Sequence, residues 1–180
     1  MPNEGFFNPG ELLDQLGVGE GMLVADFGCG AGEVAIMMAR RVGASGLVTA
    51  LDVLPEVIES LRGKADAEGL HNVHIGRANL EIAGSTMLRD NSQQLVYLGN
   101  ILWQTNKKLE VLQEAVRVTA PSGSVVAVEW MPGVQGFGPP EDLRISGEKL
   151  KKIILQAGLE VERSFPAGAY HYGVIAKKHA

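Results

Sequence analysis

The chain has 180 residues, of which 46% are hydrophobic and 21% charged, so we expect a single compact, soluble domain over residues 1–180 with a sizeable core. Its formal net charge of −5 argues against the broad basic face that nucleic-acid binding requires, and its one cysteine excludes a disulfide framework or a cysteine metal cluster. No apolar run reaches the roughly 18 residues of a membrane span, and the first residues lack the basic start of a signal peptide, so the expected location is cytoplasmic.

Hydrophobic periodicity and breaker residues predict strands and helices that alternate along the chain. The predicted strands are residues 22–27, 47–51, 73–75, 94–98, 124–129, 159–165 and 172–177. The predicted helices are residues 11–16, 33–42, 55–68, 106–118 and 147–157. Ser146 is the expected N-cap of the last helix, and Pro121-Ser122-Gly123 predicts a turn before the fifth strand.

Strands separated by helices favour parallel pairing, so this pattern predicts an α/β fold with a doubly wound sheet. The last two strands are joined only by residues 166–171, which are too few for a crossover helix. We therefore expect these two strands to form an antiparallel hairpin at one side of the sheet. Ligands of such sheets bind at the carboxyl ends of the strands, and this rule selects the candidate site residues.

The first strand runs into a glycine-rich turn, Gly28-Cys29-Gly30-Ala31-Gly32, and the second strand ends in Asp52. Glycines at such a turn let a ligand approach the backbone, and an acid at the end of the next strand can bind the hydroxyls of a ribose. The spacing therefore predicts a nucleoside site. The alternative for Asp52 is an acid that caps the helix beginning at Pro55.

The charges around the turn indicate which kind of nucleoside fits. Gly32 lies one position earlier than the last glycine of the dinucleotide pattern, Glu33 stands in that place, and Asp26 precedes the turn by two residues. Two carboxylates would repel a pyrophosphate. They would attract the sulfonium and ammonium groups of S-adenosylmethionine.

The pattern Asp26-x-Gly28-x-Gly30-x-Gly32 resembles the first motif of class I S-adenosylmethionine-dependent methyltransferases. Over roughly residues 5–177 the chain most resembles the group that includes the ubiquinone/menaquinone-biosynthesis type. The resemblance implies S-adenosylmethionine as the cofactor and a Rossmann-like, seven-stranded, mostly parallel sheet with one reversed strand. It assigns segment 26–32, Cys29 included, to the methionine half of the cofactor, Asp52 to the ribose and Val53 to the adenine.

After the third strand the chain departs from similar enzymes. Arg77 stands where many of them have an acid that meets the adenine amino group, and Arg cannot accept a hydrogen bond. We expect Ala78 and Asn79 to contact the cofactor, with Asn79 or a backbone carbonyl replacing the acid. Gly99, at the end of the fourth strand, completes the predicted cofactor-binding set.

Three residues are the catalytic candidates: Asn100, Glu129 and His171. Asn100 follows the fourth strand, where similar enzymes line the methyl-transfer centre, and either its amide or that of Gln104 can orient an acceptor. Glu129 ends the fifth strand and is either a base or an anchor for the linker that follows. His171 is a candidate base because a histidine pKa can sit near neutral, and its alternative is a hairpin-tip residue in water.

Other segments are expected to surround the site. The Gly- and Pro-rich linker 131–145 is the predicted mobile lid. Trp103 either stacks on the substrate or the sulfonium, or packs in the core. His71 and His74 have no metal-ligand partners at a suitable spacing, so no metal site is predicted. The aromatic residues that could rim the mouth are Phe6, Phe7, Phe137, Tyr170 and Tyr172.

These features predict an enzyme that transfers a methyl group from S-adenosylmethionine to a small or lipid-like metabolite. The alternative is a methyltransferase-like binding module or partner subunit with little catalysis. A short-chain reductase would need a Tyr-x-x-x-Lys pair, which the chain lacks. About twenty residues precede the first strand and no helical insert covers the site, so we expect an open site that a larger substrate, a homodimer or a partner subunit completes.

Overall fold

The computed structural model describes residues 9–179, and strands alternate with helices along them. The helices are α1 Pro9–Leu16, α2 Glu33–Val42, α3 Pro55–Ala67, α4 Lys108–Val118 and α5 Gly147–Gln156, with single 3-10 turns at η1 Leu102–Gln104 and η2 Glu141–Leu143. The strands are β1 Leu23–Phe27, β2 Leu47–Asp52, β3 Val73–Arg77, β4 Gln93–Gly99, β5 Thr119–Trp130, β6 Glu160–Ala167 and β7 His171–Lys177.

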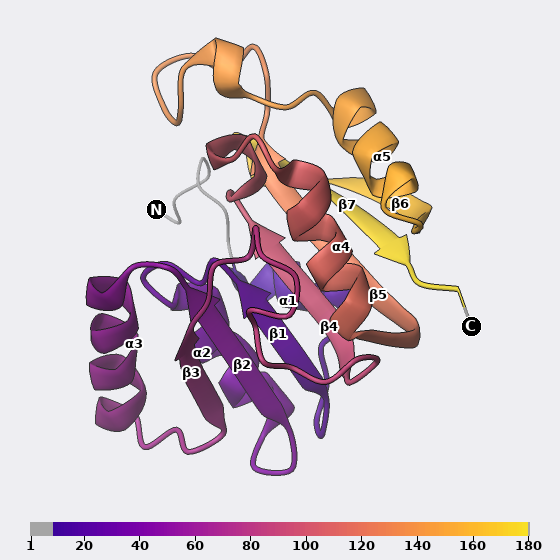
Figure 1. Ribbon diagram of the computed structural model, residues 1–180. Coiled ribbons are helices and arrows are strands. Elements are labelled where there is room, and N and C mark those ends of the chain that lie inside the picture. Colours follow the sequence, from indigo (N-terminus) through magenta and orange to yellow (C-terminus); the bar gives the residue numbers. More distant parts are fainter. Residues whose placement is uncertain (1–8, 180) are drawn as a thin grey trace.

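The seven strands form one sheet in the order β3-β2-β1-β4-β5-β7-β6 (Figure 1). Strands β1 to β5 pair in parallel, whereas β7 runs antiparallel to both β5 and β6. The predicted doubly wound sheet with an antiparallel C-terminal hairpin is therefore confirmed. The strand order reverses between β1 and β4, so the connections that follow these two strands cover opposite faces and leave a crevice between them.

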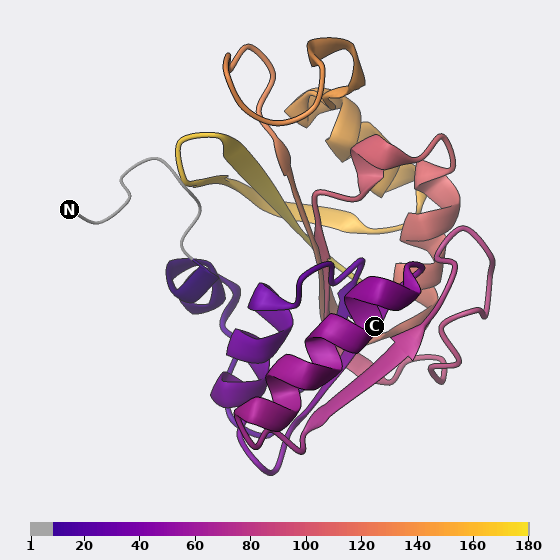
Figure 2. The ribbon, with the colours of Figure 1, turned by 90° about the vertical axis from the view of Figure 1, so that its left-hand side faces the viewer.

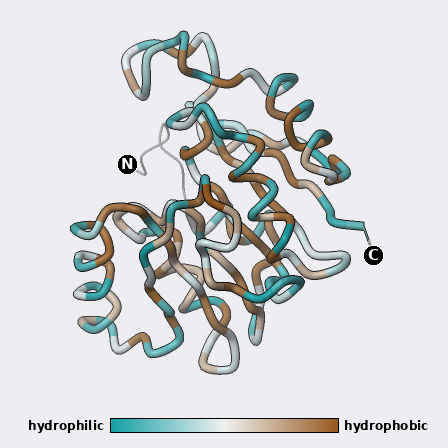
Figure 3. The backbone as a smooth tube through the Cα atoms, viewed as in Figure 1, coloured by the Kyte–Doolittle hydropathy of each residue, from teal (hydrophilic) through white to brown (hydrophobic). Residues whose placement is uncertain are grey.

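Helices cover both faces of the sheet, with α1 and α2 on one side and α4 and α5 on the other (Figure 2). The first face buries Leu12 of α1, Met38 of α2 and Leu61 of α3 against alternate residues of the central strands. The second face buries Leu112 of α4 and Leu150 of α5. Hydrophobic stretches run along the central strands, while the helices alternate between polar and apolar turns (Figure 3). No helix in the described part of the chain is both long and apolar enough to cross a membrane.

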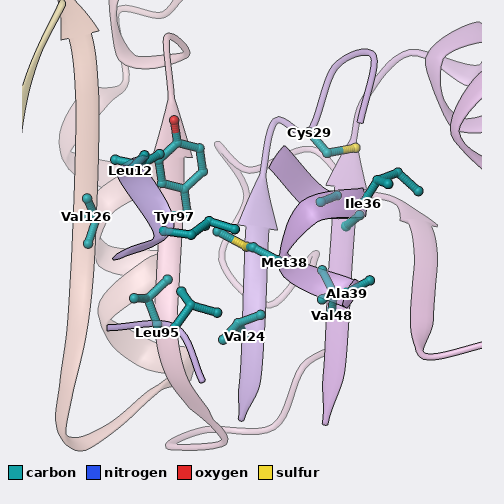
Figure 4. Packing of buried hydrophobic residues seen from close by; sticks show 14 of the residues in the cluster. Leu12, Val24, Cys29, Ile36, Met38, Ala39, Val48, Leu95, Tyr97 and Val126 are labelled. Atoms are coloured by element: carbon teal, nitrogen blue, oxygen red, sulfur yellow. The ribbon is translucent and has the colours of Figure 1, made fainter. Parts of the chain in front are cut away.

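Helix α2 shows how the local sequence specifies an element. Its buried residues are Ala35, Ile36, Met38, Ala39 and Val42, which recur at helical spacing. Gly43 follows at φ 65°, a conformation that glycine adopts without steric cost, and its N–H bonds to the carbonyl of Ala39. Met38 lies against β1 and β4 (Figure 4), and burying such a side chain contributes roughly 1.5–3 kcal/mol.

The start of β5 differs from the prediction. The turn expected at residues 121–123 lies inside the strand as an irregularity, because β5 begins directly after α4 and first pairs Thr119 with Gln93. The register then jumps so that Ser124 pairs with Leu95, and the intervening Ser122 takes φ 61°. The backbone does turn at the predicted place, but β5 pairs with β4 both before and after residues 121–123, so the turn is a bulge within the strand.

Residues 78–92 connect β3 to β4 without a helix. This segment is held to α4 by the buried Glu114 and its ion-pair partner Arg117 instead. The carboxylate of Glu114 accepts hydrogen bonds from Gly84 N, at 2.9 Å, and from Thr86 Oγ1, at 2.6 Å. Arg117 pairs with Glu114 and reaches Asp90 at 2.6 Å, so one ion pair on α4 holds both halves of the connection.

Candidate functional site

The loop after β1 is tied to the end of β2 through its backbone. Gly28 N and Cys29 N both donate to the carbonyl of Leu51, at 2.7 and 3.0 Å. Gly28 takes φ 76°, and a Cβ there would lie 2.3 Å from Ile101 Cγ2, so only glycine fits. Gly30 takes φ 48°, but a Cβ there would meet no atom within 4 Å. Gly30 therefore faces the open space in which a ligand can approach the backbone.

Asp52 joins the glycine loop to the segment after β2. Its Oδ2 accepts from Gly30 N at 3.0 Å, and its Oδ1 accepts from Leu54 N at 3.1 Å. The N-cap residue of α3 is Leu54, without a side-chain cap, so the alternative of Asp52 as a helix cap is wrong. A carboxylate oxygen can accept more than one hydrogen bond, and Asp52 thus remains able to bind hydroxyls.

A cavity of about 510 Å³ lies between the glycine loop, the end of β2, the 78–92 connection and the segment after β4. Among the residues that line it are eight predicted site residues: Gly28, Gly30, Asp52, Val53, Ala78, Asn79, Gly99 and Asn100. Val53 is 46% exposed and offers an apolar wall. The structure therefore brings together residues that are as far apart in the sequence as Gly28 and Asn100.

Two polar residues of this larger cavity, Glu81 and Thr105, were not predicted. Glu81 accepts a hydrogen bond from Thr105 Oγ1 at 2.5 Å and pairs with Lys107 at 3.5 Å, which joins the 78–92 connection to the segment before α4. The Thr105 bond lowers the pKa of Glu81. Glu81 and Thr105 belong to segments without a recognisable motif, and only their place after β3 and β4 could have indicated them. Gln104, the alternative to Asn100 for orienting an acceptor, also lines this cavity.

A smaller cavity of about 190 Å³ adjoins the larger one and shares Gly28, Gly99 and Asn100 with it. Asp26 and Glu33 both line it, as does Cys29. Asp26 is buried, and no described residue donates a hydrogen bond to its Oδ2. Burial, together with the charge of Asp52, raises the pKa of Asp26 to about 7. This cavity therefore has an acidic wall with an unsatisfied acceptor.

Tyr97 also lines the smaller cavity and was missed by the sequence analysis. It pairs with Asp26 in the register of β4 and β1, so both side chains lie on the same face of the sheet. Its hydroxyl points toward the carboxyl ends of the strands (Figure 4). Burial and the charge of Asp26 raise its pKa. Its position two residues before Gly99 in an alternating strand is the signal that could have identified it.

Two residues at the predicted adenine contact, Arg77 and Asn79, already form hydrogen bonds with backbone groups of the chain. Arg77 Nε donates to the carbonyl of Val53 at 2.9 Å, and Arg77 lines neither cavity. Asn79 lines the larger cavity, but its Oδ1 already accepts from Glu81 N at 3.1 Å. Arg77 thus supports the backbone after β2 instead of occupying the cavity.

Asn100 is the one catalytic candidate that lines both cavities. It takes φ 57°, its Nδ2 lies 3.2 Å from His171 Nε2, and no described residue donates to its buried Oδ1. His171 is buried and packs on Trp130 with 4.1 Å between ring centroids. The alternative of a hairpin-tip histidine in water is therefore wrong, and burial lowers the pKa of His171 to about 4.

Glu129 is fully buried at the end of β5 and lines neither cavity. Its Oε1 accepts from Leu102 N at 2.8 Å, so it holds the turn after β4 and not the linker that follows β5. Burial raises its pKa to about 7. Trp103, in the same turn, is half-buried against the core that α4 covers.

The aromatic residues expected at the rim separate into different places. Phe137 and Tyr170 contact each other, with ring centroids 5.1 Å apart. Tyr172 lies toward α5 and donates to the carbonyl of Ile145 at 2.6 Å. Phe6 and Phe7 lie outside the described residues. Within residues 9–179, no group of three or more His, Cys, Asp or Glu side chains could hold a metal ion.

Comparison with known families matches residues 24–123 to the methyltransferase domain family. The demethylmenaquinone methyltransferase of Geobacillus stearothermophilus is 32% identical over 128 residues, which are 71% of this chain and 53% of that protein. The enzyme of the same name from Listeria monocytogenes is 31% identical over the same shares. The chain thus spans about half the length of the curated relatives it matches.

Solved structures show the same fold. An S-adenosylmethionine-dependent methyltransferase from Aquifex aeolicus superposes with a TM-score of 0.88 at 29% identity, covering 95% of this chain and 89% of that one. The [4+2]-cyclase SpnF superposes with a TM-score of 0.80 at 18% identity, covering 96% of this chain and 80% of that one. The second likeness concerns the fold alone.

Proposed function

Because the chain belongs to the class I S-adenosylmethionine-dependent methyltransferases, we propose that it transfers the methyl group of this cofactor to a small or lipid-like metabolite. Fold alone does not determine chemistry, since the same architecture carries unrelated activities. The proposal therefore depends on the two cavities at the carboxyl ends of β1, β2 and β4.

The observation that carries the proposal is the unsatisfied acceptor in the smaller cavity. Asp26 Oδ2 is buried without a donor among the described residues, and Glu33 lines the same cavity. A buried carboxylate without a partner is costly, and a cationic ligand removes that cost. The ammonium group of S-adenosylmethionine fits this wall, whereas a pyrophosphate would be repelled by it.

The larger cavity fits the adenosine half of the cofactor. We assign Asp52 to the ribose hydroxyls, and Val53 and Ile101 to the apolar surface around the adenine, because all three line this cavity. Asn79 retains its Nδ2 donors, which suit a ring nitrogen, and its Oδ1 is already engaged. We therefore assign the adenine amino group to a backbone carbonyl of the 78–80 segment.

The chemistry requires little from the protein beyond placement. The bound cofactor supplies an activated methyl group, and the chain contributes proximity and alignment of the acceptor. Asn100 is our candidate for contact with the acceptor, since its unpartnered Oδ1 lies where the two cavities meet. Glu129 and His171 stand behind the cavities, where they hold the η1 turn and Asn100.

The relatives suggest a substrate class. The curated relatives named above are demethylmenaquinone methyltransferases, so we propose an electron-rich quinol-like ring as the acceptor. Such a nucleophile needs little help from a base, in keeping with cavities that neither Glu129 nor His171 lines. A homodimer or partner subunit would complete the site on its open side.

Calorimetric titration with S-adenosylmethionine, S-adenosylhomocysteine and NAD tests the cofactor site. We expect micromolar binding of the first two and none of NAD. Gly30→Val should block binding sterically, and Asp52→Ala should weaken it by about 1–3 kcal/mol through the lost ribose contact. Gly63→Val and Asp66→Ala, on the exposed side of α3, are the matched controls.

Unchanged affinity in both site variants would overturn this placement of the cofactor. Binding without turnover on any quinol or small phenolic acceptor would instead favour the binding-module alternative. NAD binding would contradict the argument from the charges of Asp26 and Glu33.

A further inference from the structure

The segment from Met131 to Arg144, which we call the β5 loop, is organised around one side chain. Arg144 is 5% exposed at its side chain, and its guanidinium donates to the carbonyls of Met131 at 2.8 Å, Val134 at 2.6 Å and Pro139 at 3.0 Å. It also donates to the carbonyl of Phe137. A planar guanidinium can satisfy several acceptors at fixed angles, so this residue determines the path of the loop.

The β5 loop rests on the indole ring of Trp130, the last residue of β5. The Arg144 guanidinium carbon lies 5.9 Å from the ring centroid of Trp130. Gly138 takes φ 82°, and a Cβ there would lie 2.5 Å from Trp130 Cε3. The loop backbone therefore packs directly on the ring, at the end of the sheet where the loop extends beyond β5 (Figure 1).

Trp130 in turn contacts the residue that holds Asn100. Trp130 and His171 are register partners on β5 and β7, and their rings lie 4.1 Å apart. His171 Nε2 then accepts from Asn100 Nδ2 at 3.2 Å. The backbone of Asn100 is fixed separately, since its N–H bonds to the carbonyl of Val128 at 2.8 Å. What His171 determines is the direction of the amide, and hence where Oδ1 points.

We propose that the β5 loop sets the orientation of the Asn100 amide through Trp130 and His171, with Arg144 as the positioning residue. The loop carbonyls bind the guanidinium of Arg144, which lies over the indole of Trp130. That indole packs on the imidazole of His171, which bonds to the Asn100 amide where the two cavities meet. Coupling between two sites is reciprocal, so a ligand that engages Asn100 also orders the loop. The proposal assigns the loop a role in the site that does not require it to touch a ligand.

The side-chain amide resonance of Asn100, identified by its loss in Asn100→Asp, tests the proposal in the ligand-free protein. Arg144→Met should shift this resonance, although residue 144 does not touch Asn100. His171→Phe should shift it as well, because phenylalanine retains the ring packing on Trp130 but cannot accept the hydrogen bond. His171→Gln places an acceptor near the position of Nε2 and should restore the bond.

Arg163→Met is the matched control. Arg163 also lies over an aromatic ring, 5.3 Å from Phe165, and also donates to a backbone carbonyl, that of Gln15 at 2.8 Å. Its removal should leave the Asn100 resonance unchanged. If Arg144→Met does not fold, Arg144→Lys retains the charge but not the planar set of donors, and is expected to give the same shift.

Hydrogen exchange with S-adenosylhomocysteine is a second test, which depends on the proposed function because Asn100 lines both cavities assigned to the cofactor. The ligand should slow exchange in residues 132–143 of the wild type, and this protection should disappear in His171→Phe. Arg144→Met should weaken ligand binding 3- to 10-fold. An unmoved Asn100 resonance in Arg144→Met and Arg144→Lys would overturn the coupling, whereas a moved resonance without ligand binding would overturn only the proposed cofactor.

Discussion

At the end of β1, the carboxyl group of Asp26 is buried at the expense of stability. It is buried beside Asp52, and its pKa of about 7 in the folded chain lies far above its usual 3.8. The folded state therefore prefers the protonated acid, while the unfolded state ionises near pH 4. It follows that this residue lowers the free energy of unfolding as the pH rises from about 4 to about 7.

We therefore expect Asp26→Asn to raise the free energy of unfolding by about 1–3 kcal/mol at pH 8, and by much less at pH 4.5. The same change should weaken S-adenosylhomocysteine binding at least about tenfold, because the ammonium loses its counter-ion. Urea denaturation at the two pH values, with Asp66→Asn as the exposed control, measures the first effect. Equal gains at both pH values would show that ionisation of Asp26 is not the cause.

At the scale of elements, the 78–92 connection depends on α4 because it lacks a helix. Glu114 is buried, and its pKa of about 2 reflects the hydrogen bonds from Arg117, Gly84 and Thr86, which outweigh burial. A lowered acid pKa adds stability above the unfolded value near 4.5, and this stability is lost as the pH falls toward 2. The connection carries Ala78 and Asn79 into the larger cavity, so its support bears on the site.

Replacing the buried carboxylate should destabilise the protein more than any exposed change on the same helix. Glu114→Gln leaves Arg117 half-satisfied, and we expect a loss of about 2–4 kcal/mol at pH 7. Glu110→Gln, in the exposed first turn of α4, is the matched control and should change stability by less than about 0.5 kcal/mol. The difference should shrink below pH 4, and urea denaturation across that range measures it.

At the scale of the whole molecule, the buried polar residues near the two cavities lie on opposite faces of one sheet. The face covered by α1 and α2 buries Asp26 and Tyr97 at its carboxyl end, and the face covered by α4 buries Glu129 beneath the η1 turn. Asn100 lies where the strand order reverses, and it lines both cavities. A single sheet that carries both cavities leads us to propose that the chain unfolds as one domain.

Calorimetry of the complete chain should then show one cooperative transition, with equal calorimetric and van't Hoff enthalpies. S-adenosylhomocysteine at 100 times its dissociation constant should add about 2.7 kcal/mol to the free energy of unfolding, and NAD should add nothing. Two resolved transitions would contradict a single domain. If the thermal transition splits into two only when ligand is bound, the cofactor stabilises one part of the sheet and not the other.

Much of the fold follows from local pattern. Helix α2 begins at Glu33 and ends at Val42 as predicted, and the short 166–171 connection correctly indicated the antiparallel hairpin. Strand β3 runs two residues past the predicted end at Ile75, because Arg77 pairs with Asp52 on the neighbouring strand. Strand ends depend on the partner strand, which local sequence does not contain.

By itself, the sequence determined the elements, the glycine turn and the acids that indicate a cationic nucleoside, because these depend on neighbours within a few residues. Only the tertiary structure decided that His171 is buried against Asn100 and that Glu129 holds Leu102. Insertion of β7 between β5 and β6 brings His171 to Trp130 and, across β5, to Asn100. Contacts across 71 residues depend on strand order and register, which no local periodicity encodes.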